Sequence, residues 1–533
     1  MKILFHCIGL IAVLGCAGST LAQVSVTTYH NDNSRTGQNL QETILTTSNV
    51  NSTEFGKLFS QSLDGYSYSQ PLYVPNVSIL GLGTHNVVYV TTMSDSVYAF
   101  DSDSNNGSNA SPLWKVNFTN PSKGITAVPT SDLNCDTTMT DQVGIMSTPV
   151  IDTSSNTIYV LVRTLESGSY YHRLHALDIP TGADKFGGPI EIQATVAGKG
   201  SGSQGGNVSF NSRLEAQRSA LLLQNSLVYI GWSSLCDYGN YHGWLMAYEA
   251  QNLAQTAVWL TTPNGEDGGI WQSGNGVAGD SSYNTFVAIG NGTFDAHSGG
   301  SDYGQSVVKV SPPSKGEFPV LDYFTPYNAK TYNNTDLDVG SSGLTLLPDQ
   351  TSGPYPHLLV QGDKAGNLYL INRDNMGHYN SANNNQIVQY LVAPTKGMWS
   401  SPAWWNNYVY VGGQAAPLKA FSFNTNTGLL STTASSRTSL QFPYPGTTVS
   451  ISSNGTSNGI VWALDNGDYK NSTGNAALYA FKATNLASEL YSSTSNGSRD
   501  KPGAAVKFSV PTVVNGKVYV MTQKALVVYG LLK

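Results

Sequence analysis

The sequence predicts an all-β fold, namely a single eight-bladed β-propeller of four-stranded antiparallel blades. Three observations support this prediction. A unit of two short apolar runs joined by a turn recurs eight times along the 533 residues, and such self-similarity indicates a repeat architecture. The 54 glycines and 30 tyrosines, together with many Ser, Thr and Asn residues, are typical of short strands connected by turns. No stretch has the periodicity of a long amphipathic helix.

Each copy of the unit starts with an apolar run such as "VVYV", passes a small polar break, and finishes its second run near an acidic residue. The eight copies begin at Asn86, Thr157, Leu227, Thr285, His357, Tyr408, Gly459 and Lys517. A further strand precedes the pair at 69–74, 147–152, 219–224, 341–347, 400–405 and 509–514. A fourth strand follows it at 112–118 and 257–263. Four antiparallel strands per copy form the blade of a β-propeller.

The eighth copy lacks a fourth strand of its own, because the chain ends at Lys533, shortly after the third. The segment 56–65, "GKLFSQSLDG", precedes the first copy and has the pattern of a strand. We expect this segment to complete the last blade and close the ring, which removes open sheet edges. Residues 23–533 then form one domain.

Residues 1–22 are predicted to be a secretory signal peptide. Lys2 supplies a positive start, an apolar stretch follows, and small residues ending at Ala22 precede Gln23. A lipoprotein anchored through Cys16 is the weaker alternative. No later segment is long and apolar enough to cross a membrane. The chain is therefore expected to be exported, secreted or periplasmic.

The predicted export bears on two further features, a possible disulfide and possible N-glycosylation. Of four cysteines, the mature chain keeps Cys135 and Cys236, which predicts one disulfide in an oxidising compartment. The alternative is two buried free thiols. Eleven Asn-x-Ser/Thr sequons lie between Asn51 and Asn496, and they indicate a glycosylated surface if the source is a eukaryote. The alternative is chance in a chain rich in Asn, Ser and Thr.

Charge and motif content exclude several function classes. The formal net charge is −7, only 11% of residues are charged, and no basic run occurs, so no nucleic-acid partner is expected. The sequence contains no Gly-x-Ser-x-Gly elbow, Walker loop or zinc motif. It contains no Cys-x-x-Cys-His either, so no attached c-type haem is expected.

The stretch "IGNGTFD", 289–295, allows three interpretations of Asn291. Asn-Gly after an apolar run is a strong turn signal. Asn291-Gly292-Thr293 is also a sequon. An asparagine at the end of a strand can also bind a metal through its amide oxygen. The residues alone leave these alternatives open.

Longer segments resemble a known family. "GGIWQSGNGVAGDSSYNTFVAIGNGTFDAHSGGSDYGQSVVKV" at 268–310, "DLDVGSSGLTLLPD" at 336–349, "LVQGDKAGNLYLINRDN" at 359–375 and "SSLCDYGNYHGWLMAYE" at 233–249 resemble consecutive blades of the quinoprotein alcohol dehydrogenases. The N-terminal segment 28–50 resembles the opening of that family. Its members are eight-bladed propellers that hold pyrroloquinoline quinone (PQQ) and Ca²⁺ on the axis. The resemblance is best over about 215–375 and extends elsewhere only to the repeat.

The resemblance nominates five residues. Asp237, Asn291 and Asp338 fall on the positions that bind Ca²⁺, and their oxygens suit this hard cation. Asp338 also falls on the catalytic base. Trp271 falls on the ring that stacks against the quinone, and Lys364 on the basic residue that contacts the quinone oxygens. Taken singly, each of the five also has a purely structural interpretation, as a residue in a turn, in the packing between blades or on the solvated surface.

The implied activity is the oxidation of an alcohol or sugar, with the electrons leaving to a separate acceptor. Asp237 replaces a Glu of the family, and the family's adjacent Cys-Cys pair is absent. A Cys135–Cys236 disulfide on the same face is a hypothesis, because Cys236 adjoins Asp237. The alternative function is a non-catalytic propeller that retains PQQ-type repeats as a binding or assembly scaffold. A carbohydrate-binding surface around Trp404 and Trp405 is a third possibility, although these side chains are better suited to packing between blades.

Overall fold

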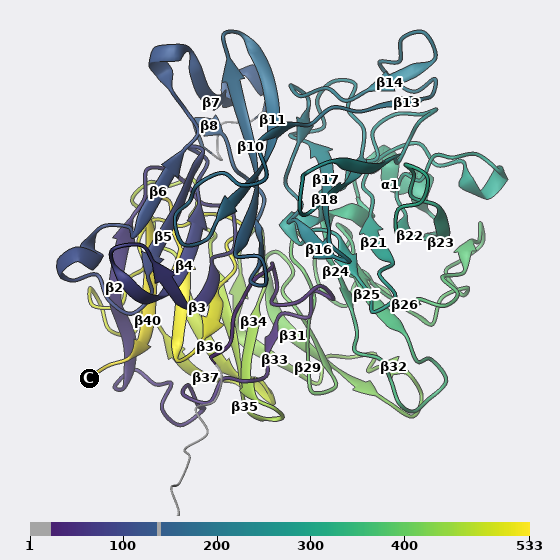
Figure 1. Ribbon diagram of the computed structural model, residues 1–533. Coiled ribbons are helices and arrows are strands. Elements are labelled where there is room, and N and C mark those ends of the chain that lie inside the picture. Colours follow the sequence, from purple (N-terminus) through teal and green to yellow (C-terminus); the bar gives the residue numbers. More distant parts are fainter. Residues whose placement is uncertain (1–22, 136–139) are drawn as a thin grey trace, which may run out of the picture.

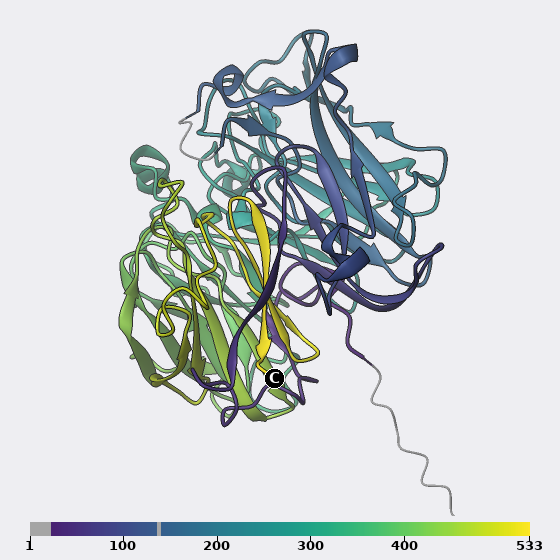
Figure 2. The same cartoon turned by 90° about the vertical axis from the view of Figure 1, so that its left-hand side faces the viewer.

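The computed structural model describes residues 23–135 and 140–533. Within these ranges the chain forms eight four-stranded blades around a central axis, as predicted (Figures 1 and 2). The proposed signal peptide and Cys16 lie outside the described residues. Among the described residues, no helix has both the length and the apolar character needed to span a bilayer.

The blades follow one another along the chain, each with its strands in antiparallel order from the axis outward. Blade 1 is built from β3 (Leu72–Ile79), β4 (Gly83–Thr91), β5 (Ser96–Asp101) and β6 (Trp114–Asn117). Blade 2 is built from β9 (Val150–Asp152), β10 (Thr157–Glu166), β11 (Ser169–Asp178) and β12 (Ile190–Glu191). Blade 3 is built from β16 (Leu222–Gln224), β17 (Leu227–Ser234), β18 (Trp244–Glu249) and β19 (Gln255–Leu260). Blade 4 is built from β20 (Ala278–Gly279), β21 (Thr285–Ala288), β22 (Val307–Val310) and β23 (Val320–Thr325).

The second half of the ring repeats this arrangement. Blade 5 is built from β24 (Leu344–Leu346), β25 (Leu358–Gly362), β26 (Leu368–Asn372) and β28 (Gln389–Leu391). Blade 6 is built from β29 (Ala403–Trp405), β30 (Tyr408–Val411), β31 (Ala416–Asn424) and β33 (Ser436–Phe442). Blade 7 is built from β34 (Ser450–Asn454), β35 (Ser457–Asp465), β36 (Ala477–Lys482) and β37 (Asn485–Ser492). All eight predicted strand pairs are present.

The last blade closes the ring by joining the two ends of the chain. It contains β38 (Thr512–Val514), β39 (Lys517–Met521) and β40 (Ala525–Leu531). Its outer strand is β2 (Phe55–Ser62), which pairs antiparallel with β40 from Phe55↔Leu531 to Ser62↔Ala525 (Figure 1). The prediction that 56–65 supplies this strand is therefore correct, although the strand begins and ends slightly earlier.

The hydrophobic core is divided into layers between neighbouring blades. Eight clusters of buried apolar side chains each join two adjacent blades. Trp404 and Trp405 belong to two of these layers, with 4% and 1% of their surface exposed. A carbohydrate surface at these tryptophans is therefore ruled out, because burial of this extent leaves no ring face for a sugar.

Short elements decorate this ring. β7 (Ile125–Pro129), β8 (Gln142–Val143) and β15 (Glu215–Ala216) extend blades 2 and 3, while β27 (His378–Tyr379) and β32 (Leu429–Leu430) add to blades 4 and 6. β13 (Thr195–Ala197) and β14 (Asn207–Ser209) form a separate hairpin, and α1 (Ala329–Thr335) precedes blade 5 (Figure 1).

The N-terminal residues 26–39, which we term the plug, form hydrogen bonds with each of the eight blades in turn. Backbone or side-chain hydrogen bonds from the plug reach Tyr73, Ile151, Leu223, Gly279, Leu346, Trp404, Ile451 and Val513, one residue in each of the eight blades. The plug ends in β1 (Gln38–Asn39), which pairs parallel with β34. One end of the central channel is thereby blocked.

Arg35 anchors the plug. Its guanidinium is fully buried and donates to the carbonyl oxygens of Val277, Leu221 and Tyr29 and to the hydroxyl of Thr28, at 2.7–3.2 Å. Burial lowers the pKa of Arg35 to about 10, so the side chain remains charged at neutral pH.

Candidate active site in the axial cavity

A cavity of about 270 Å³ opens at the end of the axis opposite the plug. Its walls come from two kinds of segment, those that lead into a blade's first strand and those that connect its second and third strands. Both lie at the same end of the ring, because the second strand runs antiparallel to the first. The cavity is close to the lower limit of about 300–1,000 Å³ that is usual for small-molecule sites.

All five residues nominated by the resemblance line this cavity. Asp237 follows β17, Asn291 follows β21 and Lys364 follows β25. Trp271 and Asp338 lie in the segments that lead into blades 4 and 5. The structure thus brings together residues from three blades that are distant in sequence. Their roles as ligands, base and stacking ring are considered below.

Lys364 connects two carboxylates at the cavity wall. Its ammonium lies 3.0 Å from Asp338 Oδ2 and 2.6 Å from Asp336 Oδ1. The other oxygen of Asp338 accepts a hydrogen bond from the Asn291 backbone N–H at 3.1 Å. The Asp338 and Lys364 side chains are 16% and 14% exposed, whereas that of Asp336 is 64% exposed. Asp338 is therefore a sheltered carboxylate with one cationic partner.

The side chain of Asn291 is held by two partners at the cavity wall. Its Nδ2 donates to Asp336 Oδ1 at 2.9 Å, and its Oδ1 accepts from Gln305 Nε2 at 2.7 Å. Asn291 lies at a bend shortly after the end of β21. The sugar interpretation is disfavoured, because the same amide is already engaged and lines a confined space.

Burial and neighbouring charges shift the pKa values of Asp338 and Lys364. It raises the pKa of Asp338, Lys364 opposes that effect, and the negative charges of Asp336 and Asp237 reinforce it. Burial also acts against the charge of Lys364, but attraction to Asp338 and Asp336 raises the pKa of Lys364 overall. Asp338 therefore holds its proton more tightly than an exposed carboxylate, which is a property of a general base.

A second acidic group surrounds Tyr241 at the same wall. The Tyr241 hydroxyl donates to Asp237 Oδ1 at 2.9 Å. Burial raises the pKa of Tyr241, and the charges of Asp237, Asp267 and Asp338 raise it further. The half-buried Asp267 has a pKa raised to about 7 by burial and by the charges of Glu266, Asp237 and Asp338. These carboxylates are therefore close enough to interact.

Aromatic rings and one disulfide form the remaining walls. Trp271 meets Phe508 edge to face at 5.3 Å between ring centroids, and Trp399 meets Tyr444 in the same way at 5.2 Å. The Lys364 ammonium lies 5.9 Å from the Trp399 ring. Such a lining suits a planar aromatic ligand.

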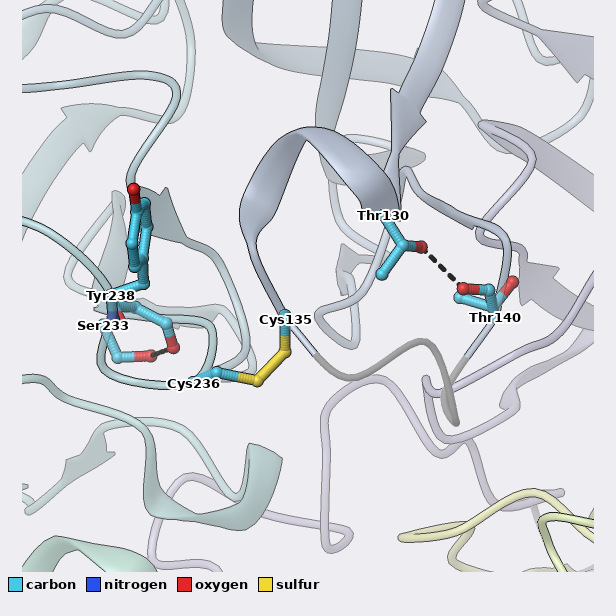
Figure 3. Close-up of a disulfide and its surroundings, with 7 residues drawn as sticks. Thr130, Cys135, Thr140, Ser233, Cys236 and Tyr238 are labelled. Atoms are coloured by element: carbon cyan, nitrogen blue, oxygen red, sulfur yellow. Dashed lines mark hydrogen bonds between the residues drawn. A yellow bond between two sulfur atoms is a disulfide. The ribbon is translucent and has the colours of Figure 1, made fainter.

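The predicted disulfide between Cys135 and Cys236 is present in the structure and lies at this cavity (Figure 3). Cys135 follows the 3-10 helix η3 (Thr130–Leu133), and Cys236 lies in the loop after β17. The bridge links residues 101 positions apart and so ties blade 2 to blade 3. It also fixes the loop that carries Asp237.

Reduction of this disulfide is expected to lower the free energy of unfolding by about 3 kcal/mol, because a bridge that closes a long loop restricts the unfolded chain. Denaturation with and without dithiothreitol measures the effect, and a Cys135→Ser/Cys236→Ser variant serves as the control that reductant should not change. A thiol count of two on unreduced mature protein would contradict the bridge.

Several lining residues were not singled out as functional by the sequence. Lys507 and Phe508 lead into blade 8, Trp399 into blade 6 and Tyr444 into blade 7. Arg218 leads into blade 3. Their common signal is a place shortly before a predicted first strand. Aligning the eight copies on that strand would have found them.

Comparison with known proteins supports the fold. No protein-family model matches the chain, and no curated protein matches it. The quinohemoprotein alcohol dehydrogenase ADHIIG from Pseudomonas putida HK5 is structurally similar, with a TM-score of 0.58 and 14% identity over 95% of this chain and 80% of that one. The quinohemoprotein alcohol dehydrogenase from Comamonas testosteroni gives 0.59 and 13% over the same shares. Sqt1 from Saccharomyces cerevisiae gives 0.51 and 11% over 90% of this chain and all of that one. Identity this low shows a shared fold and nothing more.

Proposed function

We propose that the protein is an exported oxidoreductase that uses PQQ and Ca²⁺ to oxidise an alcohol or a sugar. One observation carries the proposal: five residues nominated from their order in three blades line one axial cavity. The structural neighbours named as quinohemoprotein alcohol dehydrogenases support the same proposal. The Cys135–Cys236 disulfide is consistent with an extracellular or periplasmic location.

The cavity residues fit a bound quinone. PQQ is a planar aromatic acid, and the cavity offers Trp271 and the Cys135–Cys236 disulfide as walls, with cations on the side chains of Arg218, Lys364 and Lys507. When bound, PQQ would supply a two-electron acceptor that no side chain provides. Trp271 would orient its plane, and Lys364 would place a positive charge beside its oxygens.

A Ca²⁺ ion in this cavity would need oxygen ligands from the quinone in addition to those of the protein. Asp237, Asn291 and Asp338 would hold the ion through the oxygen ligands that Ca²⁺ prefers. Among the described residues, no three His, Cys, Asp or Glu side chains are grouped so as to hold a metal. The Asn291 amide and further oxygens are therefore required to complete the coordination.

Within this proposal Asp338 accepts the proton of the substrate hydroxyl. Its oxygens are oriented by the Asn291 N–H and by Lys364, at 3.1 and 3.0 Å. Lys364 favours the ionised carboxylate and so opposes the effect of burial on its pKa. Because the sequence contains no Cys-x-x-Cys-His, a separate protein or small molecule would take the electrons away.

A binding scaffold that retains the cavity without turnover is the second candidate. The observation in its favour is that Lys364 and the Asn291 backbone already occupy both oxygens of Asp338. A group that is satisfied internally has less to offer a substrate.

Purified mature protein is expected to bind PQQ in the presence of Ca²⁺ and to reduce a redox dye when an alcohol or sugar is added. Quenching of tryptophan fluorescence measures binding, and dye absorbance measures turnover. Chelation of Ca²⁺ should weaken both, with Mg²⁺ as the matched control. Absence of binding at micromolar PQQ would refute the oxidoreductase, and binding without turnover on a broad alcohol and sugar panel would favour the scaffold.

A further inference from the structure

A second hollow, which we term the side groove, lies between the start of β11 and the β13–β14 hairpin. Its volume is about 480 Å³, which is within the range of about 300–1,000 Å³ that is usual for small-molecule sites. The β10–β11 and β13–β14 hairpins project at the same end of the ring (Figure 1). One wall follows the turn between the second and third strands of blade 2, and another leads into blade 3. The side groove therefore lies at the same end of the ring as the axial cavity.

Neutral polar side chains dominate the lining of the side groove. They are Ser169, Gln204, Asn207, Ser209, Asn211 and Ser212. Gln204 and Asn207 are exposed, so their amide donors and acceptors are available to a ligand. Arg213 is the single charged side chain among the described residues that line the groove. Amides and hydroxyls both donate and accept hydrogen bonds, and they match a ligand that is rich in hydroxyl groups and carries no charge.

Two aromatic rings complete the lining, and contacts within the protein fix both of them. Phe210 packs edge to face against Trp232 and Trp244, at 5.3 and 5.8 Å between ring centroids. The Arg213 guanidinium lies 5.7 Å from the centre of the Tyr170 ring. Phe210 and Tyr170 are each half-buried, so part of each ring is open to a ligand. Rings that are already oriented lower the ordering cost of binding.

Asp132 forms the wall between the side groove and the axial cavity. Its carbonyl oxygen accepts hydrogen bonds from Arg213 Nε and Nη2, at 3.2 and 2.9 Å. Its Oδ2 accepts from the Tyr170 hydroxyl at 2.9 Å. Asp132 belongs to η3, which leads directly to Cys135 of the axial cavity. The two sites are therefore neighbours, and the one cation of the groove is already engaged by the protein.

We propose that the side groove binds a neutral oligosaccharide. Sugar hydroxyls would bond to the amides and serines, and the C–H face of a sugar ring would pack on Tyr170 or Phe210. A cation would find no carboxylate among the described lining residues, and an anion would find only Arg213. The proposal does not depend on PQQ chemistry. Together with the proposed function, it selects a sugar over a simple alcohol as the substrate.

Asn207 gives the proposal a direct chemical check, because Asn207-Val208-Ser209 is one of the eleven sequons. A glycan on Asn207 would itself occupy the groove that this side chain lines. We therefore expect Asn207 to be unmodified in the protein purified from its source, as measured by peptide mass spectrometry. A glycan found there would overturn the proposal.

Binding is tested by calorimetry on the full mature protein without PQQ. The probes are neutral hexasaccharides of glucose, mannose, galactose, xylose and N-acetylglucosamine, each compared with its monosaccharide. At least one hexasaccharide is expected to bind about tenfold or more tightly than its monosaccharide. Added salt should leave its affinity unchanged, because neither the probe nor its contacts depend on charge. Binding of no hexasaccharide at millimolar concentration would refute the proposal.

A double variant and a matched control locate the site. Gln204→Ala/Asn207→Ala is expected to weaken the bound hexasaccharide about tenfold or more, since it removes the exposed amides of the groove. Gln251→Ala/Asn426→Ala is the control, because both residues are exposed and neither lines the groove. Both proteins should keep the circular dichroism of the parent, since only exposed side chains change. Equal affinity in the two double variants would contradict the assignment.

The titrations also separate this proposal from the proposed function. Oligosaccharide binding with no PQQ-dependent oxidation would preserve the side groove and refute the oxidoreductase. PQQ-dependent oxidation of simple alcohols with no oligosaccharide binding would do the reverse. Where both hold, Gln204→Ala/Asn207→Ala is expected to raise KM for the oligosaccharide and to leave kcat unchanged.

Discussion

Replacing Asp338 with asparagine is expected to reduce PQQ-dependent alcohol or sugar oxidation by about 10²–10⁴-fold, the usual contribution of a general base. The substitution keeps the size of the side chain and an oxygen that can accept from the Asn291 N–H, but it removes the proton acceptor. Binding of PQQ should persist, because the asparagine keeps an amide oxygen that can bind Ca²⁺ and the aromatic walls and cations of the cavity are unchanged. Steady-state kinetics and fluorescence titration on the same preparation measure the two quantities.

Asp336→Asn is the matched control. Asp336 contacts the same Lys364 ammonium, at 2.6 Å, but 64% of its side chain is exposed. We expect less than about a tenfold loss of rate from this substitution, as for an exposed charge pair. A large loss in Asp336→Asn with little loss in Asp338→Asn would transfer the base to Asp336.

The pH profile provides a second readout of Asp338. A general base must be deprotonated, so kcat/KM should fall as the pH drops through its pKa. Burial raises the pKa of Asp338 in the metal-free protein, whereas a bound Ca²⁺ would favour the ionised carboxylate, so the fall is expected to move to lower pH as Ca²⁺ saturates the site. The acidic limb should disappear in Asp338→Asn.

Replacing Arg35 with methionine is expected to lower the free energy of unfolding by about 5 kcal/mol. Three buried carbonyl oxygens, those of Val277, Leu221 and Tyr29, lose a donor, at about 1–3 kcal/mol for each buried group left unsatisfied. The plug that Arg35 anchors also bonds to every blade, so the loss extends beyond one contact. Equilibrium denaturation in urea measures the change.

Arg437→Met provides the comparison. Arg437 is exposed on β33 in blade 6, and surface substitutions of this kind usually change stability by less than about 0.5 kcal/mol. If Arg35→Met were as stable as Arg437→Met, the plug would be an accessory to the ring and not one of its supports.

Sequence reasoning succeeded for features with local signals. Apolar runs separated by turns predicted all eight strand pairs, because such runs must be buried on both faces between blades. The closing strand β2 was found for the same reason, although its pattern alone did not fix its ends. The end of the strand before Asn291 was also predictable, because Asn-Gly after an apolar run signals a break in the strand.

The plug and the side groove had no local signal. Residues 26–39 form only one two-residue strand, β1, and their hydrogen bonds go to a different partner in each blade. The segment therefore has no sequence periodicity from which its role could be predicted. The side groove combines Tyr170 of β11, Asn207 of β14 and Arg213 of the segment before blade 3. Exposed Asn, Gln and Ser residues occur throughout the chain, so which of them share one groove is a property of the assembled ring.

Ring closure sets the order in which the protein can fold. The plug and β2 are synthesised first, yet their last partners, Val513 and the strand β40 (Ala525–Leu531), are synthesised at the end. Pairing of such distant segments is slow, and until it occurs β2 and the inner strands expose unpaired edges. A chain that stops before residue 525 can never pair β2 with β40. At high concentration the same interval lets β2 of one molecule pair with β40 of another, which is a direct route to a domain-swapped dimer.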